Sequence, residues 1–240
     1  MRGSRRGGNS ARFDEDSRLI GRWFDKNAEG SFAGSREIAP SRAAAGPRVP
    51  RHSGAWSMMR KRLQAEPGLR IVDVGSTSPA NINFLTELGH SIFLSDLVRD
   101  ACTGNWKSGE DADGSPILDP DAFLKQSLDL SGRKFDIVFL WTSLDYLPEP
   151  FVEPVVTHLY SNMNPGGQVL ALFHTRTLGP ETAYSRFHVT TGDTVEVQAA
   201  ESFPIQRSFT NRSIEKLFQG WSGHKQFLAK DSLSEVIMTR

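Results

Sequence analysis

The chain has 240 residues, enough for one α/β domain with a sizeable core and a tail, at roughly 100–200 residues per domain. Its 28 basic and 28 acidic residues cancel, but residues 1–62 hold 14 basic and 6 acidic residues, so this part carries +8 and the remainder −8. A single cysteine, Cys102, excludes an internal disulfide framework and cannot by itself form a structural zinc site.

Residues 1–50 are predicted to form a basic, largely disordered arm, because Gly, Ser, Arg and Ala offer little surface to bury. Between Phe13 and Phe24 the apolar residues share one face among charges, which predicts a short amphipathic helix. The arm is interpreted either as a solvated leader or as a segment that contacts an acidic partner. Its arginines lack nearby aromatic residues for base stacking, which disfavours nucleic acid as the partner.

No stretch approaches the ~20 apolar residues that a membrane helix requires, and the amino terminus lacks the apolar core of a secretory signal. The sequence therefore predicts a soluble, cytoplasmic protein without a transmembrane segment.

The first predicted elements of the domain form a strand, helix, strand unit that ends in an acid. Leu69–Val74 is a compact apolar run, typical of a parallel strand buried on both faces, and Gly75 follows where the backbone must turn. Asp96 ends the second strand, where a carboxylate can accept hydrogen bonds from the two hydroxyls of a ribose. The unit and the helix before it are predicted as helix 56–65, strand 69–74, helix 81–88 and strand 91–95.

The middle of the chain continues the alternation after an irregular connection. Residues 100–120 are rich in Gly, Asp, Ser and Pro and predict a long connection, and residues 123–130 fit either a short helix or an edge strand. The next elements are predicted as strand 135–141, helix 150–162 and strand 168–174. Alternating strands and helices favour an α/β, Rossmann-like, doubly wound, mostly parallel sheet.

The last third departs from this rhythm. A small β-hairpin is predicted within an inserted segment, 175–209, that is interpreted as a lid. Thr210 or Asn211 can cap a helix that Gly220 ends. The hairpin strands are predicted at 186–190 and 194–197, and two terminal strands that pair antiparallel are predicted at 225–229 and 235–239.

Several motifs, in order, resemble the class I methyltransferases that use S-adenosylmethionine. The likeness covers residues 56–240, and the expected methyltransferase-like domain is 51–240. It implies a seven-stranded sheet whose last strand is antiparallel. The motifs are VDVGSTSP at 72–79, IFLSDL at 92–97, SLDLSGRKFDIVFLW at 127–141, WTSLDYLPEP at 141–150 and NPGGQVLALFH at 164–174.

The resemblance also implies a set of residues for S-adenosylmethionine. Asp73 takes the position near the methionine amino group, Asp96 that of the ribose ligand, and Asp129 with Leu130 the position beside the adenine. Each acid also has a structural interpretation: Asp73 bonds turn amides, and Asp96 caps the next segment. The full predicted set is Asp73, Gly75, Ser76, Ser78, Asp96, Leu97, Asp129, Leu130 and Trp141.

The glycine-rich loop departs from the family pattern. Three alternating glycines are expected, whereas only Gly75 is present and Ser76 and Ser78 add bulk where the cofactor's amino-acid end is expected. The hydroxyls of Ser76, Thr77 and Ser78 can bond the methionine carboxylate or helix amides, and Pro79 suits a first helical turn. A non-catalytic methyltransferase-fold module that binds a partner is therefore the alternative function. A dinucleotide-binding oxidoreductase is disfavoured, because no G-x-G-x-x-G follows the strand.

Methyl transfer mainly requires alignment of the acceptor, and a base only where the acceptor keeps its proton. Asp145, Tyr146 and His174 are the candidate catalytic residues, since each follows a predicted strand near the acceptor side. Tyr184 and His188 are expected to line the lid without a catalytic role. The signature motifs of DNA-base methyltransferases are absent, so a small-molecule acceptor is expected, and no metal is predicted.

Overall fold

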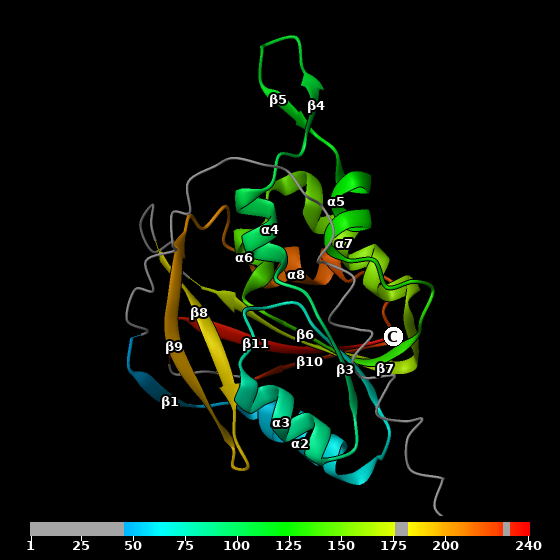
Figure 1. The fold of residues 1–240 in the computed structure, drawn as a ribbon, viewed down its shortest axis with the longest axis vertical. Coiled ribbons are helices and arrows are strands. Elements are labelled where there is room, and N and C mark those ends of the chain that lie inside the picture. The colour runs from blue at the N-terminus through cyan, green and yellow to red at the C-terminus, as the bar shows by residue number, and fades with distance from the viewer. Residues whose placement is uncertain (1–45, 176–181, 228–230) are drawn as a thin grey trace, which may run out of the picture. The chain divides into compact units, whose positions relative to one another are not determined.

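The central sheet of the computed structural model has six strands, in the order β10-β11-β7-β6-β2-β3 (Figure 1). Their bounds are β2 (Arg70–Asp73), β3 (Ser91–Leu94), β6 (Phe135–Trp141), β7 (Met163–His174), β10 (Gly223–Phe227) and β11 (Leu233–Thr239). Strands β3, β2, β6 and β7 run parallel, and β11 is antiparallel to both β7 and β10. The antiparallel final strand agrees with the sequence prediction.

The structure describes residues 46–175, 182–227 and 231–240, which belong to the compact unit Ala44–Arg240. The predicted amphipathic helix between Phe13 and Phe24 lies outside the described residues, as do 228–229 of the predicted strand 225–229. No helix of the described part is long and apolar enough to cross a membrane.

Helices cover both faces of the sheet (Figure 1). Apolar side chains of α2 and α3 pack in the same buried cluster as Ile137 and Phe139 of β6, while those of α4, α5, α7 and α8 pack with Val138 and Leu140. Successive residues of a strand point to opposite faces, so the apolar run of β6 is buried on both sides. The helices are α2 (Gly54–Ala65), α3 (Pro79–Glu87), α4 (Leu97–Thr103), α5 (Pro120–Ser127), α6 (Ser143–Tyr146), α7 (Glu149–Ser161) and α8 (Asn211–Leu217).

Side-chain caps fix where several of these helices begin. Ser78 caps α3, Asp96 caps α4, Asp119 caps α5 and Thr210 caps α8, each accepting a hydrogen bond from a backbone amide of the first turn. Pro79 and Pro120 occupy the first turns, where no intrahelical amide is required. Of the two alternatives for residues 123–130, the structure contains the helix, α5.

The expected seventh strand of the sheet is not present in the described residues, and β3 forms the edge. Between α4 and α5 the chain instead forms a two-stranded hairpin, β4 (Lys107–Glu110) and β5 (Pro116–Leu118), that projects from the helices (Figure 1). The prediction of seven strands is therefore not confirmed in the described residues, where the central sheet has six. The physical reason is the composition of this segment, which offers no apolar run to bury beside β3.

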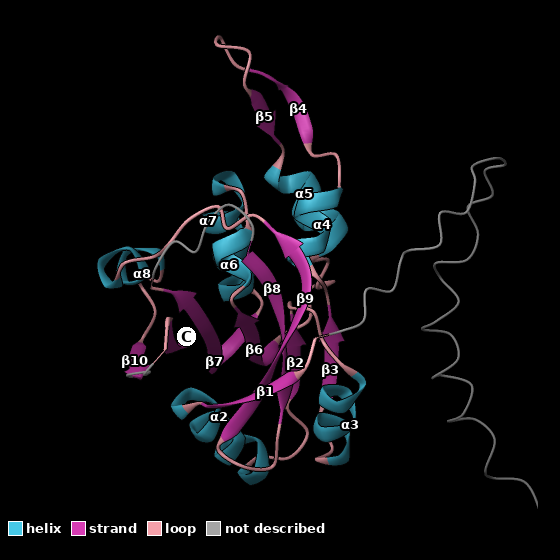
Figure 2. Cartoon of the chain, turned by 90° about the vertical axis from the view of Figure 1, so that its left-hand side faces the viewer, coloured by secondary structure: helices cyan, strands magenta, loops and turns pink. Residues whose placement is uncertain are grey.

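A second, three-stranded antiparallel sheet crosses the unit in the order β1-β9-β8 (Figure 2). It consists of β1 (Arg48–His52), β8 (Thr182–Val189) and β9 (Thr194–Phe203), so β8 and β9 are longer than the predicted hairpin strands. Because β1 pairs with β9, residues 48–50 belong to this sheet although the predicted arm extended to residue 50. Phe187 and Val195 join the core beneath it.

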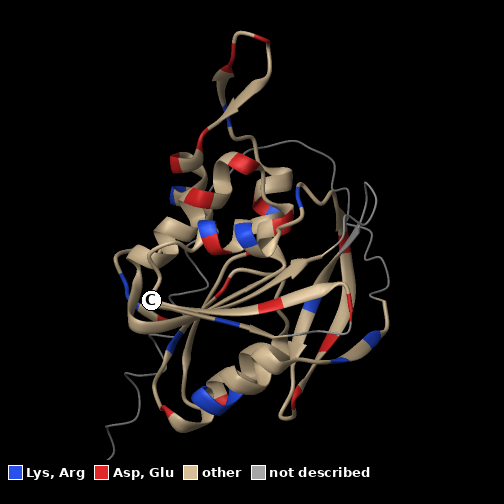
Figure 3. Ribbon diagram, turned by 180° about the vertical axis from the view of Figure 1, so that it is seen from behind, with Lys and Arg blue, Asp and Glu red and all other residues tan. Residues whose placement is uncertain are grey.

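Charged residues of both signs are interspersed on the face that Figure 3 shows. Opposite charges are close enough to pair, as Arg60 does with Asp193 at 2.8 Å and Arg62 with Glu66 at 3.1 Å. These are exposed or half-buried pairs, which contribute about 0–1 kcal/mol each.

Candidate functional site

The carboxyl ends of the parallel strands meet at one edge of the central sheet. Asp73 at the end of β2 is level with Leu94 of β3 and with Phe139 of β6. From β2 the chain continues to β3 on one side and later returns to β6 on the other. Ligands of open α/β sheets bind in the crevice outside such a point. The candidate site lies at this edge.

Asp73 is fully buried at the centre of the site. Its Oδ1 accepts hydrogen bonds from the indole Nε1 of Trp141 at 3.0 Å and from the amide of Gly75 at 3.3 Å. Burial raises the pKa of this carboxyl to about 6, because the ionised form loses its hydration. The Thr77 hydroxyl lies beside this carboxylate and opposes the rise in its pKa, although its geometry with Oδ2 falls short of a full hydrogen bond.

Gly75 is needed because two aromatic side chains come close to its backbone. A Cβ at this position would lie 2.7 Å from Cδ1 of Trp141 and 3.6 Å from the hydroxyl of Tyr184. The first distance is shorter than carbon atoms tolerate. The space beside the loop, where the resemblance puts the amino-acid end of the cofactor, is therefore occupied by residues of this chain.

The polar groups of the loop after Gly75 are bonded to alternate residues of β8. The amide of Ser76 donates to the hydroxyl of Tyr184 at 3.3 Å, and the Ser76 hydroxyl accepts from the guanidinium of Arg186 at 3.2 Å. The Ser78 hydroxyl caps α3 and pairs with Nδ1 of His188 at 2.9 Å. Ser78 thus has the helix-amide role that the sequence offered as one of two alternatives.

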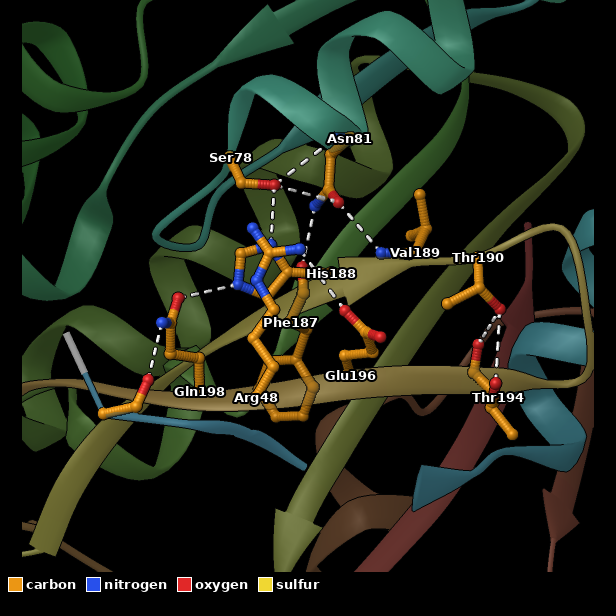
Figure 4. A network of polar contacts seen from close by, with 11 residues as sticks. Arg48, Ser78, Asn81, Phe187, His188, Val189, Thr190, Thr194, Glu196 and Gln198 are labelled. Atoms are coloured by element: carbon orange, nitrogen blue, oxygen red, sulfur yellow. Dashed lines mark hydrogen bonds and ion pairs between the residues drawn. The ribbon is translucent and has the colours of Figure 1, made fainter. Parts of the chain in front are cut away.

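A buried network fastens β8 to the start of α3 (Figure 4). Asn81 Nδ2 donates to the carbonyl of Phe187 at 2.8 Å, and its Oδ1 accepts from the amide of Val189 at 2.9 Å. His188 contacts Ser78 through Nδ1, and its other ring nitrogen, Nε2, pairs with Gln198 of β9 at 2.9 Å. Burial lowers the pKa of His188, so its imidazole is held neutral. His188 therefore links the loop to the second sheet.

Asp96 has the capping role and is also accessible. Its side chain accepts from the amide of Arg99 at 3.2 Å and remains 24% exposed, with the Arg99 guanidinium 3.8 Å away. Burial raises its pKa as well. The neighbouring Leu97 is fully buried in the core, and its amide donates to the carbonyl of Val74 at 3.2 Å. Of these two predicted residues, the structure leaves only Asp96 accessible to a ligand.

Asp129 and Leu130, predicted beside the adenine, have structural roles here. The Asp129 carboxylate is exposed and accepts from the amide of Ser131 at 2.8 Å, in a turn where Ser131 has a φ of 51°. Leu130 is buried in the core. An Asx-type turn satisfies the carboxylate locally, so the two residues provide no contact that ties them to the site.

Trp141 ends β6 in an uncommon backbone conformation. Its φ is 47°, in the left-handed region that costs a bulky residue roughly 1–3 kcal/mol. The ring stacks on Phe187 with centroids 4.9 Å apart and tilts against Phe139 at 5.3 Å. These contacts and the bond to Asp73 hold the indole against Gly75.

The three candidate catalytic residues lie together beside this cluster. Asp145 Oδ2 accepts from the His174 amide at 2.7 Å and pairs with His174 Nδ1 at 2.6 Å, although the two residues are 29 apart in the sequence. Asp145 is fully buried, and burial raises its pKa. The ring of Tyr146 meets those of His174 and Tyr184 edge to face, at 6.0 and 5.1 Å. The Asp145 carboxylate orients the imidazole with its Nδ1 proton toward the acid.

Four of the buried oxygen atoms without a full hydrogen bond in the described residues belong to segments at this edge: Asp73 Oδ2, Thr77 Oγ1, Thr142 Oγ1 and Asp145 Oδ1. The Thr77 hydroxyl interacts with the Asp73 carboxylate, so Thr142 Oγ1 and Asp145 Oδ1 are the two left for another group. Buried polar atoms are normally satisfied, so a cluster of unsatisfied ones indicates a place for water or a polar ligand. The described residues contain no group of three or more His, Cys, Asp or Glu that could hold a metal ion.

Sequence reasoning missed Arg186 and Thr142. The alternation of Tyr184, Arg186 and His188 was visible as a period of two, which puts the three on one face of a strand. Nothing local identified the facing loop, because these contacts join residues 108–110 apart.

The structure is an α/β fold with a mixed central sheet of six strands, in which β11 is antiparallel to both of its neighbours. The chain is similar to several solved structures of methyltransferases that depend on S-adenosylmethionine. The sequence matches no protein-family model and none of the curated proteins.

Three of these similar structures have sequence identities of 12–16% to this chain. TehB from Haemophilus influenzae has 12% identity over 78% of this chain, with a TM-score of 0.44, and the chain spans 62% of its length. An S-adenosylmethionine-dependent methyltransferase from Mesorhizobium loti has 16% identity, over 78% of this chain and 98% of its own, with a TM-score of 0.44. Magnesium protoporphyrin IX methyltransferase from Synechocystis PCC 6803, solved with bound S-adenosylmethionine, has 14% identity over 77% of each chain and a TM-score of 0.43. A substrate that appears in one of these names is the substrate of that protein.

Proposed function

We propose that this chain is a methyltransferase that uses S-adenosylmethionine and acts on a small-molecule acceptor. The observation that carries the proposal is the pair of unsatisfied buried oxygens that follow β6 at the carboxyl edge, Thr142 Oγ1 and Asp145 Oδ1. A buried polar group without a hydrogen-bond partner costs about 1–3 kcal/mol. Such groups at one place therefore indicate that a ligand binds there.

The acids of the site fit a cationic cofactor. Asp73 and Asp96 would hold its ammonium and ribose groups, because each presents a carboxylate oxygen that internal bonds do not fully use. S-adenosylmethionine supplies an activated methyl group when bound. The loop fits less well, because Trp141 and Tyr184 lie against Gly75. The residues therefore fit the cofactor on the side of the acids and require a rearrangement beside the loop.

His174 is proposed to remove a proton from the acceptor. The Asp145 carboxylate fixes the proton on Nδ1, so Nε2 can accept one. This assignment favours acceptors with a hydroxyl or a protonated nitrogen, which must lose a proton during methyl transfer. The buried aromatic rings of Tyr146 and Tyr184 beside the dyad exclude water from it.

Replacing Asp96 by Asn is expected to weaken S-adenosylmethionine binding at least tenfold, measured by isothermal titration calorimetry. The side-chain amide keeps the cap of α4 but removes a charged acceptor, whose hydrogen bond is worth about 1.5–3 kcal/mol. Asp129→Asn is the matched control, because that acid is exposed in a turn, and we expect a change below about twofold. Equal losses in both variants would remove Asp96 from the cofactor site, and no heat from the wild type at millimolar ligand would refute cofactor binding.

A second candidate function, a non-catalytic module that binds a partner, is favoured by one observation. Trp141 and Tyr184 fill the space beside Gly75 that a cofactor would need. The basic arm is then the segment that contacts an acidic partner, and its removal should abolish partner retention in a pull-down. The deletion should end at residue 45, because the Gly46 carbonyl accepts from Gln198 at 2.7 Å and β1 begins at Arg48. Unchanged retention would exclude the arm from this function.

A further inference from the structure

The position of Tyr184 distinguishes the two candidate functions, because this side chain lies against the loop that a cofactor would need. Its side chain is 1% exposed, and its hydroxyl accepts from the Ser76 amide and pairs with the Ser143 hydroxyl, both at 3.3 Å. The same hydroxyl would be 3.6 Å from a Cβ at Gly75. The ring of Tyr184 thus closes the loop that follows β2.

We infer that Tyr184 is a side-chain plug that must leave the loop before a cofactor's amino-acid end can bind there. This inference rests on the proposed binding of S-adenosylmethionine. Tyr184 accounts for the bonded Ser76 amide, whereas Trp141 remains the closer neighbour of Gly75.

The hydrogen bonds of Tyr184 are weaker than the bond of Trp141 to Asp73, although the buried ring of Tyr184 also packs on Tyr146 at 5.1 Å and on Phe203 at 5.9 Å. Its two hydrogen bonds are neutral and long, each worth about 0.5–1.5 kcal/mol. Trp141, by contrast, donates to a carboxylate at 3.0 Å and stacks on Phe187. A ligand carboxylate that replaces the Tyr184 hydroxyl as the acceptor for the Ser76 amide must also displace the Tyr184 ring from this packing.

The backbone of β8 favours a side-chain movement over a movement of the strand. Asn81 bonds the backbone of both Phe187 and Val189, which fixes the strand beyond Tyr184. Immediately around Tyr184, the pairing of β8 with β9 shifts register between Ala183 and Ser185. Such irregularities re-aim single side chains and occur beside active sites. The strand beyond Tyr184 is therefore fixed, and the local shift in register sets the orientation of the Tyr184 side chain.

The plug also lies within the field of the acids assigned to the cofactor. Asp96 and Asp73 both interact electrostatically with Tyr184, and together with burial they raise the pKa of its phenol. The phenol of Tyr184 therefore stays neutral and cannot balance the negative charge of these acids, whereas a cationic ligand can. Arg186 bonds the Ser76 hydroxyl and Arg99 lies beside Asp96, so these are the cations that face the same space.

Titration of S-adenosylmethionine into Tyr184→Ala, Tyr184→Phe and the wild type tests the plug. Tyr184→Ala is expected to bind at least tenfold more tightly than the wild type, and Tyr184→Phe, which keeps the ring and is the safer variant for folding, about two- to fivefold more tightly. The control is Tyr160→Ala, because Tyr160 packs on Trp221 through an edge-to-face contact and has no bond to the loop. Equal or weaker binding in both Tyr184 variants, with the wild type still binding, would overturn the inference and leave the proposed function intact.

A second readout separates the two proposals. Hydrogen exchange of the Ser76 amide, measured without ligand, should be faster in Tyr184→Phe than in the wild type, because the variant lacks the accepting hydroxyl. Unchanged exchange would overturn the closure of the loop by Tyr184. Faster exchange with no binding by any variant would refute the proposed cofactor and show a closed loop without a ligand.

Discussion

Asp73→Asn is expected to make the folded chain more stable at pH 8, by about 1–3 kcal/mol, although it removes a charge from the proposed site. Burial raises the pKa of Asp73 to about 6 from an ordinary value of 3.8. The native state therefore opposes ionisation, and above pH 6 the buried charge costs free energy that the neutral amide does not. An Asn oxygen can still accept from the indole of Trp141.

The pH dependence gives the sign of this effect. Below pH 3.8 the carboxyl is protonated in both the folded and the unfolded chain, so the variant and the wild type should be equally stable there. The wild type loses stability relative to the variant as the pH rises to about 6, and the difference is constant above that. Thermal unfolding at pH 4, 6 and 8 measures it, with roughly 2–4 °C for each kcal/mol. Asp129→Asn, at an exposed acid, is the control that should show little change, and a wild type more stable at pH 8 would contradict the account.

Glu235→Ala is expected to destabilise the chain by about 3–5 kcal/mol, the typical cost of breaking a buried ion pair. Glu235 is 1% exposed and forms an ion pair with Arg51. Its Oε2 accepts from the Ala55 amide at 2.9 Å and from the Ser53 hydroxyl at 3.1 Å. The variant leaves these donors at the start of α2 without an acceptor.

Urea unfolding measures this cost, and Glu196→Ala provides the control. Glu196 pairs with Arg48 on the same strand β1, but both side chains are exposed, so we expect a loss below about 1 kcal/mol. The comparison bears on the site because Arg51 belongs to β1, and β1 anchors the sheet that carries Tyr184. Similar losses in both variants would show that Glu235 does not hold this sheet in place.

The elements that the sequence predicts well are those with dense local signals. The apolar run Phe135–Trp141 is β6 with the same bounds, because a strand buried on both faces has no polar interruption. The Gly and Pro signals around Pro79 and Gly89 bound α3 within two residues. The seventh strand, which only the resemblance and no apolar run supported, is not confirmed in the described residues.

The sequence indicated the acids of the candidate site, but it did not indicate the side chains that lie against the loop after β2. Asp73 and Asp96 follow from their place at strand ends, since parallel strands end at a common edge. Asp145 and His174 were singled out separately, and their pairing across adjacent elements appears only in the structure. The contact of Tyr184 with the loop joins residues 108 apart, and no spacing rule predicts such a contact.

The indole resonance of Trp141 reports most directly on whether the site binds S-adenosylmethionine. Its Nε1 proton is bonded to Asp73 at 3.0 Å, and Asp73→Asn identifies its peak among the five tryptophans of the chain. In a ¹H–¹⁵N spectrum titrated with S-adenosylmethionine, the account predicts that the Trp141 peak shifts in a saturable manner while the Trp106 and Trp221 peaks do not move. A Trp141 peak that stays in place at millimolar ligand would contradict the claim that this edge of the sheet is a cofactor site.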